Sequence, residues 1–195
     1  MGSNSFIEIE HKFVVGAEFD REAFLNKVAK LTPDRQAVAN VRDTYFVLAH
    51  DNAHVFRHRF DNEIQQLTAK SVEDDAAIRT EINIPIDQSK GDQGPAILEF
   101  MRVLGCRWSG NLAKEIHVAY FHDCEIVFYR AFNQGRQVYC IEFEAVDPIS
   151  IEEGFRVLSK YETALGFELE ARESRSLFEL LLLDSAPDNI KQMFA

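Results

Sequence analysis

The stretch "FIEIEHKFVV", residues 6–15, alternates charged and apolar side chains. Glu8, Glu10 and Lys12 occupy every second position, with mainly apolar residues around them. A period of two sends successive side chains to opposite faces of a β-strand. The pattern therefore predicts a strand with two carboxylates and one ammonium group on the same face. On an isolated strand such a face is typical of exposure to water.

The same alternation returns along several later stretches of the chain. The charged positions are Arg57 and Arg59, Lys70, Arg79 and Glu81, Lys114, and Glu142 and Glu144. If these strands close into a barrel, all side chains of one parity point into its lumen and the others face outward, where helices can cover them. A lumen with this lining has to hold water or charged ligands, because unpaired buried charges are costly. Carboxylates suit a divalent cation, and Arg and Lys suit phosphate oxygens.

Periodicity and capping residues also predict the order of the elements. Helices are expected at about 20–31, 96–104, 150–166 and 174–183, where apolar residues recur at helical spacing. Strands are expected at about 6–15, 41–49, 54–60, 64–72, 78–86, 112–121, 124–132 and 137–146, where β-branched and aromatic residues gather between turn signals. Ser150 with Glu153 predicts a capped helix start, and Gly166 its end.

Composition narrows the class of protein. The chain has 195 residues, of which 46% are hydrophobic, which predicts one domain over 1–195 with its own core. The formal net charge of −11 argues against a nucleic-acid partner or a polybasic membrane surface. No segment is long and apolar enough to predict a membrane span. Three separated cysteines without CxxC spacing favour a reducing compartment, and we expect a cytoplasmic protein.

Seven segments, in this order, resemble the CYTH superfamily, whose members are also called triphosphate tunnel metalloenzymes. That superfamily includes class IV adenylate cyclases, thiamine triphosphatases and inorganic triphosphatases. The matching segments are "EIEHK" (8–12), "RDTYF" (42–46), "FRHR" (56–59), "LTAK" (67–70), "RTEINIPI" (79–86), "VLGCRWSGNLAKEI" (103–116) and "CIEFEAV" (140–146). The similarity runs from residue 6 to about residue 183, which leaves 184–195 as a tail.

The resemblance implies an α+β fold with an eight-stranded antiparallel barrel, a charged lumen and helices on its outer face. It also implies that a triphosphate binds end-on in the tunnel. Glu8 and Glu10, with Glu142 and Glu144, would bind Mg²⁺ or Mn²⁺, and Glu81 would line the acidic side. The phosphates would be held by Lys12, Arg57, Arg59, Lys70, Arg79 and Lys114, and Lys12 would also assist the attacking water. We expect one metal ion rather than two.

The chain also departs from the family pattern. Ile116 stands where a second basic residue is expected, and Tyr129 or Arg130 where the late strand usually has an Asp. Asn83 and Val47 replace two further acids. Trp108, the single Trp, is expected to pack in the core rather than to form a platform for a thiamine ring.

Three functions follow from this comparison of residues. A metal-dependent hydrolase of tripolyphosphate or an organic triphosphate is favoured, because the charges that such a substrate needs are present. A class IV-type adenylate cyclase is weaker, since "SNSF" (3–6) lacks the His-Phe pair that those enzymes carry ahead of the first strand. A catalytically weak module that binds polyphosphate or a nucleotide is the third. The expected partner is a small triphosphate, and a homodimer stays open.

Overall fold

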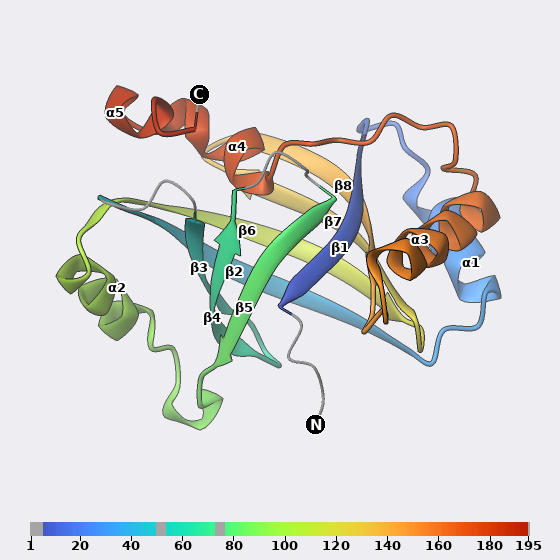
Figure 1. Cartoon of the computed structure of the whole chain (residues 1–195), viewed down its shortest axis with the longest axis horizontal. Helices are drawn as coiled ribbons and strands as arrows, with labels where there is room; N and C mark the ends of the chain where they lie inside the picture. The colour runs from blue at the N-terminus through green and yellow to red at the C-terminus, as the bar shows by residue number, and fades with distance from the viewer. Residues whose placement is uncertain (1–5, 50–53, 73–76, 195) are drawn as a thin grey trace.

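The computed structural model describes residues 6–49, 54–72 and 77–194. Eight antiparallel strands form a closed barrel in the order β1-β5-β4-β3-β2-β6-β7-β8, with helices outside it, which confirms the α+β tunnel fold (Figure 1). The strands are β1 (Ile7–Val15), β2 (Arg35–Leu48), β3 (His54–Phe60), β4 (Gln65–Ser71), β5 (Ile78–Pro85), β6 (Cys106–Tyr120), β7 (Cys124–Asn133) and β8 (Arg136–Ala145). The helices are α1 (Arg21–Lys30), α2 (Gly94–Val103), α3 (Ile151–Leu165), α4 (Leu177–Leu181) and α5 (Asp188–Lys191), with short 3-10 turns at Gln88–Lys90 and Leu183–Ser185.

Strand register brings the predicted charges together. On β1, Glu10 lies opposite Glu144 and Lys12 opposite Glu142 of β8, while Glu8 lies opposite Arg79 of β5. Since directly paired residues point to the same face of a sheet, all six side chains share the inner face. Closure of the barrel through the short β1–β5 pairing therefore turns the alternation of the first strand into one wall of a lumen.

The outward parity of the same strands forms an apolar core under α1 and α3. Ile9 and Phe13 of β1 pack there with Phe143 of β8 and Leu158 of α3, all nearly or fully buried. The start and end of α3 follow the sequence prediction, because the Ser150 hydroxyl accepts a hydrogen bond from the Glu153 amide and Gly166 ends the helix with φ of 82°. Because the apolar side chains of these strands are buried on the outward face, their inward face can carry polar residues.

A second apolar cluster closes the barrel end at which β2 ends and β3 begins. Phe178 and Leu181 of α4 pack there against Tyr45, Leu112 and other strand residues. Trp108 meets Phe178 edge-on at 5.6 Å between ring centroids, so its expected packing role is confirmed. The described part of the C-terminal tail packs on the same cluster, with Ile190 fully buried.

Two strands are longer than the sequence predicts. β2 begins at Arg35 rather than near residue 41, and β6 begins at Cys106 rather than near residue 112. Their added segments, "RQAVAN" and "CRWSGN", contain residues with weak strand propensity, but the two strands pair continuously from Arg35↔Tyr120 to Leu48↔Cys106 apart from one bulge. Tertiary pairing thus overrides local preference.

Helix α4 is also shorter than the helix predicted over 174–183. It starts at Leu177 rather than near residue 174, because Ser176 forms a capping box with Glu179. None of the helices within the described ranges combines the length and the apolar character that a membrane span requires.

Removal of the Phe178 side chain tests the role of α4 in closing the barrel. Phe178→Ala should lower the free energy of unfolding by about 3 kcal/mol or more, because it leaves a cavity in a fully packed cluster. Leu169→Ala is the control, since Leu169 is 93% exposed. Chemical denaturation measures both, and equal small effects would show that α4 does not stabilise the barrel.

Candidate functional site

The lumen of the barrel contains a cavity of about 640 Å³. Inward side chains of all eight strands line it, together with residues 174–179 and Phe194 from the C-terminal segment. The lining includes every site residue predicted from the sequence, namely Glu8, Glu10, Lys12, Arg57, Arg59, Lys70, Arg79, Glu81, Lys114, Glu142 and Glu144. The parity argument therefore places all of them correctly in one space.

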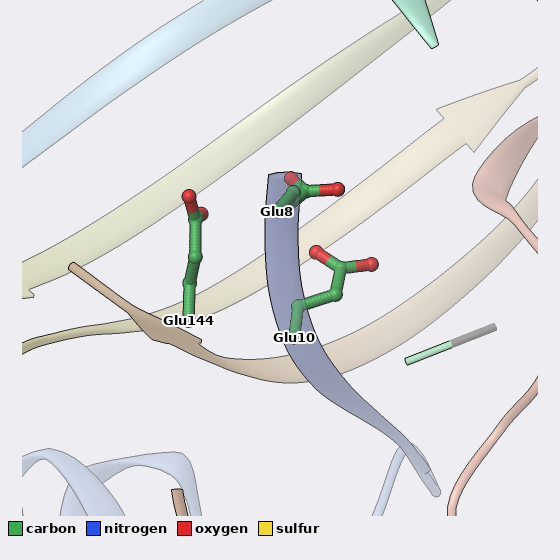
Figure 2. A group of neighbouring side chains, drawn as sticks. All are labelled: Glu8, Glu10 and Glu144. Carbon is green, nitrogen blue, oxygen red and sulfur yellow. The ribbon is translucent and has the colours of Figure 1, made fainter. Parts of the chain in front are cut away.

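Three of the carboxylates form a tight group on one wall. One oxygen from each of Glu8, Glu10 and Glu144 lies within 4.8 Å of the others, and Figure 2 shows their carboxyl groups directed to the same region. Three converging carboxylate oxygens are a donor set that suits a hard divalent cation. Glu142 lies outside this group: its Oε1 is 3.2 Å from Lys12 Nζ and accepts a hydrogen bond from the Tyr129 hydroxyl at 2.7 Å.

The pKa values of the three carboxyl groups in this acidic group are shifted from their usual range. Burial raises the pKa of Glu8 to about 8, aided by repulsion from Glu10 and Glu81 and opposed by Lys70. The pKa of Glu144 is also well above its usual value, through burial and repulsion from Glu8 and Glu10. Glu10 differs, because the cations Lys70, Lys12 and Arg79 outweigh its burial and lower its pKa. Without a cation, protons therefore relieve the repulsion at neutral pH.

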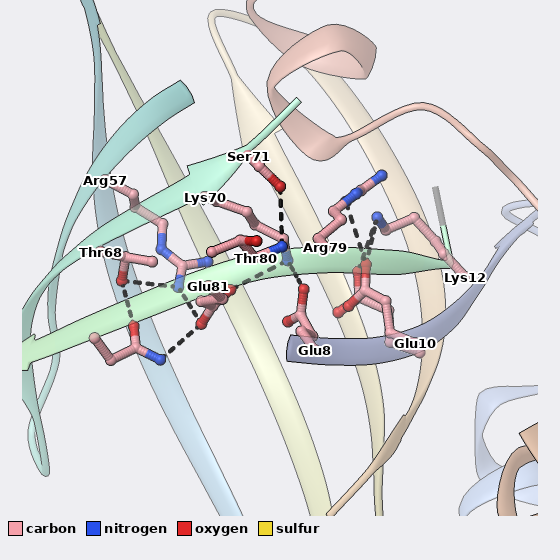
Figure 3. Close-up of polar contacts among 12 residues, drawn as sticks. Glu8, Glu10, Lys12, Arg57, Thr68, Lys70, Ser71, Arg79, Thr80 and Glu81 are labelled. Carbon is pink, nitrogen blue, oxygen red and sulfur yellow. Dashed lines mark hydrogen bonds and ion pairs between the residues drawn. The ribbon is translucent and has the colours of Figure 1, made fainter. Parts of the chain in front are cut away.

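Each predicted phosphate-binding cation is paired with a lumen carboxylate. Lys70 contacts both Glu8 and Glu81, the latter at 3.2 Å, and Arg57 approaches Glu81 at 3.7 Å (Figure 3). Glu10 Oε1 lies 3.3 Å from Lys12 Nζ and 3.5 Å from Arg79 Nη1. These pairs keep a strongly charged interior close to neutral without a ligand, which limits the cost of burying it.

Asp43 is a lumen residue that the sequence analysis missed. It is 1% exposed, accepts two hydrogen bonds from Arg59 at 3.0 and 3.1 Å, and lies 2.8 Å from Lys114 Nζ. Arg59 and Lys114 outweigh its burial, so the pKa of Asp43 is lowered. Its place in "RDTYF", two residues before the inward Tyr45, was the signal that could have revealed it.

Lys114 differs from the other lumen lysines. Burial and repulsion from Arg59 and Arg57 lower its pKa to about 8, in spite of its contact with Asp43. Lys12 shows the opposite shift, because Glu10 and Glu142 outweigh burial and raise its pKa. Lys12 therefore stays protonated at neutral pH and is a fixed positive charge.

The profile of the CYTH domain matches residues 7–176 of the sequence, which is most of the chain. The chain belongs to the CYTH domain family. A search of curated protein sequences found no significant match.

Several solved structures share the fold at low sequence identity. The PH1012 protein of Pyrococcus horikoshii OT3 is 22% identical with a TM-score of 0.71, covering 89% of this chain and 99% of its own. HpAC1 of Hippeastrum, named as an adenylyl cyclase with a dominant triphosphatase activity, is 17% identical with a TM-score of 0.60, covering 89% and 94%. The RNA triphosphatase domain of a mimivirus mRNA capping enzyme is 13% identical with a TM-score of 0.55, covering 86% and 92%.

Departures from the CYTH pattern fall at defined places in this barrel. Tyr129, not Arg130, enters the lumen, where it is buried below the Lys114 ammonium group. Arg130 instead hydrogen-bonds to the Gln137 side chain and lies 3.7 Å from Glu115 on the outside. Ile116 lines the cavity. The usual acid and base at these two positions are thus replaced by a phenol and an aliphatic group.

Asp43 should stabilise the barrel as the shared anion of two cations. Asp43→Asn leaves Arg59 and Lys114 buried without compensation, and should lower the free energy of unfolding by about 3 kcal/mol or more. Asp92→Asn is the matched control, because Asp92 forms an exposed pair with Arg42 and should change stability by less than about 1 kcal/mol. Urea denaturation of both variants compares them, and similar losses would contradict this role.

Proposed function

We propose that this chain is a divalent-metal-dependent hydrolase of triphosphates, which bind end-on in the barrel lumen. The observation that carries the proposal is the tight group of Glu8, Glu10 and Glu144 in the same cavity as six buried or half-buried cations. A carboxylate group alone is common without a metal, and a cation group alone suits any anion. Their union in one cavity suits a substrate that brings phosphates and a metal together.

Mg²⁺ or Mn²⁺ would be held by Glu8, Glu10 and Glu144, with one ion rather than two. Their buried oxygens repel one another, and a divalent cation would remove that repulsion. When bound, the metal supplies charge neutralisation at the phosphate oxygens. Glu142, which we counted among the metal ligands from the sequence, is better suited to orient Lys12, because it contacts Lys12 and Tyr129 instead.

The cations of the lumen would bind the phosphate oxygens in place of their present carboxylate partners. The planar guanidinium groups of Arg57 and Arg59 can each bind two phosphate oxygens at once. Further positive charge comes from Lys12, Lys70, Arg79 and Lys114. Lys12 keeps its proton between Glu10 and Glu142, so it would stabilise charge and position the attacking water rather than remove a proton. Hydrolysis would then depend mainly on electrostatic stabilisation and positioning.

The names of two similar proteins support a triphosphatase, whereas those of two others, from Bacillus halodurans and Vibrio parahaemolyticus, refer to an adenylate cyclase. HpAC1 is described with a dominant triphosphatase activity, and the mimivirus domain as an RNA triphosphatase. Release of phosphate from tripolyphosphate, ATP and thiamine triphosphate with Mg²⁺ or Mn²⁺ tests the proposal. Cyclic AMP and pyrophosphate from ATP would favour the cyclase, and binding without turnover would favour a binding module.

Loss of one carboxylate from the acidic group should abolish metal-dependent turnover. Glu8→Gln should lower phosphate release by at least about 100-fold, because loss of supporting groups alone weakens metal sites by up to that factor. Glu99→Gln is the control, since Glu99 forms an exposed helical pair with Arg102. Unchanged turnover in Glu8→Gln, with an intact melting curve, would contradict the assignment.

The raised pKa of Glu8 predicts a pH dependence of metal binding. Between pH 6 and 8 the free protein holds a proton that a cation must displace, so affinity for Mn²⁺ should increase with pH by up to about tenfold per unit for each proton released. The increase should level off once Glu8 and Glu144, whose pKa is also raised, have both lost their protons. Calorimetry in buffers of different ionisation heat measures the released proton, and a pH-independent affinity without proton release would refute the assignment.

A further inference from the structure

Tyr129 of β7 is a buried aromatic residue that lines the charged cavity. It is 2% exposed, and its hydroxyl and its ring contact two different charged residues of the lumen, Glu142 and Lys114. Neither the phosphate-binding set nor the acidic group includes it. Its contacts nevertheless connect it to two of the lysines that the proposed function uses.

The Tyr129 hydroxyl acts on the first of these lysines, Lys12, through a carboxylate. It donates a hydrogen bond of 2.7 Å to Glu142 Oε1, and the same oxygen lies 3.2 Å from Lys12 Nζ. Lys12 and Glu142 are directly paired across β1 and β8, whereas Tyr129 pairs with Cys140 and reaches Glu142 diagonally. Burial and the nearby Glu142 hold the pKa of the hydroxyl well above its usual value, so it keeps its proton and acts as the donor.

This hydrogen bond restrains the more accessible of the two carboxylates that contact Lys12. The side chain of Glu142 is 20% exposed, compared with 7% for Glu10. A carboxylate oxygen shared between two donors is held in one orientation and binds each donor less strongly than it would bind one alone. Without the hydroxyl, Glu142 would either hold Lys12 more tightly or turn into the cavity. Both changes would oppose binding of a phosphate at Lys12.

The Tyr129 ring contacts the second lysine, Lys114, directly. Lys114 Nζ lies 5.3 Å from the ring centroid, within the range of a cation–π interaction. The same ammonium group lies 2.8 Å from Asp43, while Arg59 and Arg57 repel it. The ring and the carboxylate therefore offset, together, the repulsion that Lys114 experiences from its neighbours.

We propose that Tyr129 is a positioning residue that holds two phosphate-binding lysines in place, Lys12 through Glu142 and Lys114 through its ring. The two ammonium groups are thereby ordered before a ligand enters, which lowers the cost of binding. That phosphate oxygens bind these lysines rests on the proposed function, whereas the arrangement of the lysines in the free protein does not.

Two variants separate the hydroxyl from the ring in the ligand-free protein. Tyr129→Phe removes only the hydroxyl, and Tyr129→Leu removes both. Tyr139→Phe is the matched control, because Tyr139 is on β8 and packs against the apolar core outside the barrel. NMR of protein with labelled lysines, assigned with Lys12→Arg and Lys114→Arg, reports on each ammonium group.

We expect Tyr129→Phe to shift the side-chain signals of Lys12 and to leave those of Lys114 under the ring current of the aromatic group. Tyr129→Leu should shift the signals of both lysines, and Tyr139→Phe those of neither. Unchanged Lys12 signals in Tyr129→Phe, or unchanged Lys114 signals in Tyr129→Leu, would overturn the inference.

Affinity for the slowly hydrolysed imido analogue of tripolyphosphate separates positioning from a merely structural role. By calorimetry, Tyr129→Phe should weaken binding about tenfold, as expected for one hydrogen bond to a charged group, and Tyr139→Phe should leave it unchanged. In a Glu142→Gln background Tyr129→Phe should have no further effect, because the hydroxyl acts through Glu142.

A lower melting temperature without a change in affinity, or equal losses of affinity in both backgrounds, would contradict the positioning role. If the unmodified protein does not hydrolyse tripolyphosphate, the proposed function fails, whereas the NMR shifts still decide whether Tyr129 positions the lysines.

Discussion

The fold depends on pairing of opposite charges inside a closed barrel. A lumen lined with Arg57, Lys70 and Lys12 would be unstable on its own, and so would one lined with Glu8, Glu10 and Glu144. Interleaved, with Lys70 between Glu8 and Glu81 and with Glu10 between Lys12 and Arg79, they offset one another. One apolar cluster then lies outside the barrel, under α1 and α3, and the second closes one end of the lumen.

The same pairing makes the interior responsive to ligands. Each predicted cation already has a carboxylate partner, so a phosphate must compete with that carboxylate. A divalent cation on Glu8, Glu10 and Glu144 would weaken the hold of these carboxylates on Lys70, Lys12 and Arg79. A bound metal would thus free the cations for the phosphates, and a bound triphosphate would free the carboxylates for the metal. The binding of the two ligands would therefore be coupled. Closure of one barrel end by α4 would give the bound molecule a direction.

Much of this could be predicted from the sequence because the signals were local. Alternation in "EIEHK" and its repetition at Arg57 and Arg59 or Glu142 and Glu144 fixed which side chains share the lumen, and capping residues fixed the start of α3. Which of these side chains contact one another could not be predicted from neighbouring residues in the sequence. Only the three-dimensional register shows that Glu142 contacts Lys12 and Tyr129, while Glu144 joins Glu8 and Glu10.

Other features were hidden for physical reasons. Asp43 stands alone between an exposed Arg42 and Thr44, and its role requires Arg59 and Lys114 from two other strands. The early part of β2 has weak strand propensity and exists because β6 pairs with it.

A thermodynamic cycle measures the coupling between metal and triphosphate binding. Calorimetry gives the affinity for the imido analogue of tripolyphosphate with and without Mn²⁺, and the affinity for Mn²⁺ with and without the analogue. We predict that each ligand strengthens the other by the same factor, about tenfold or more, and that Glu8→Gln removes this coupling. Equal affinities in the presence and absence of the other ligand would contradict the account.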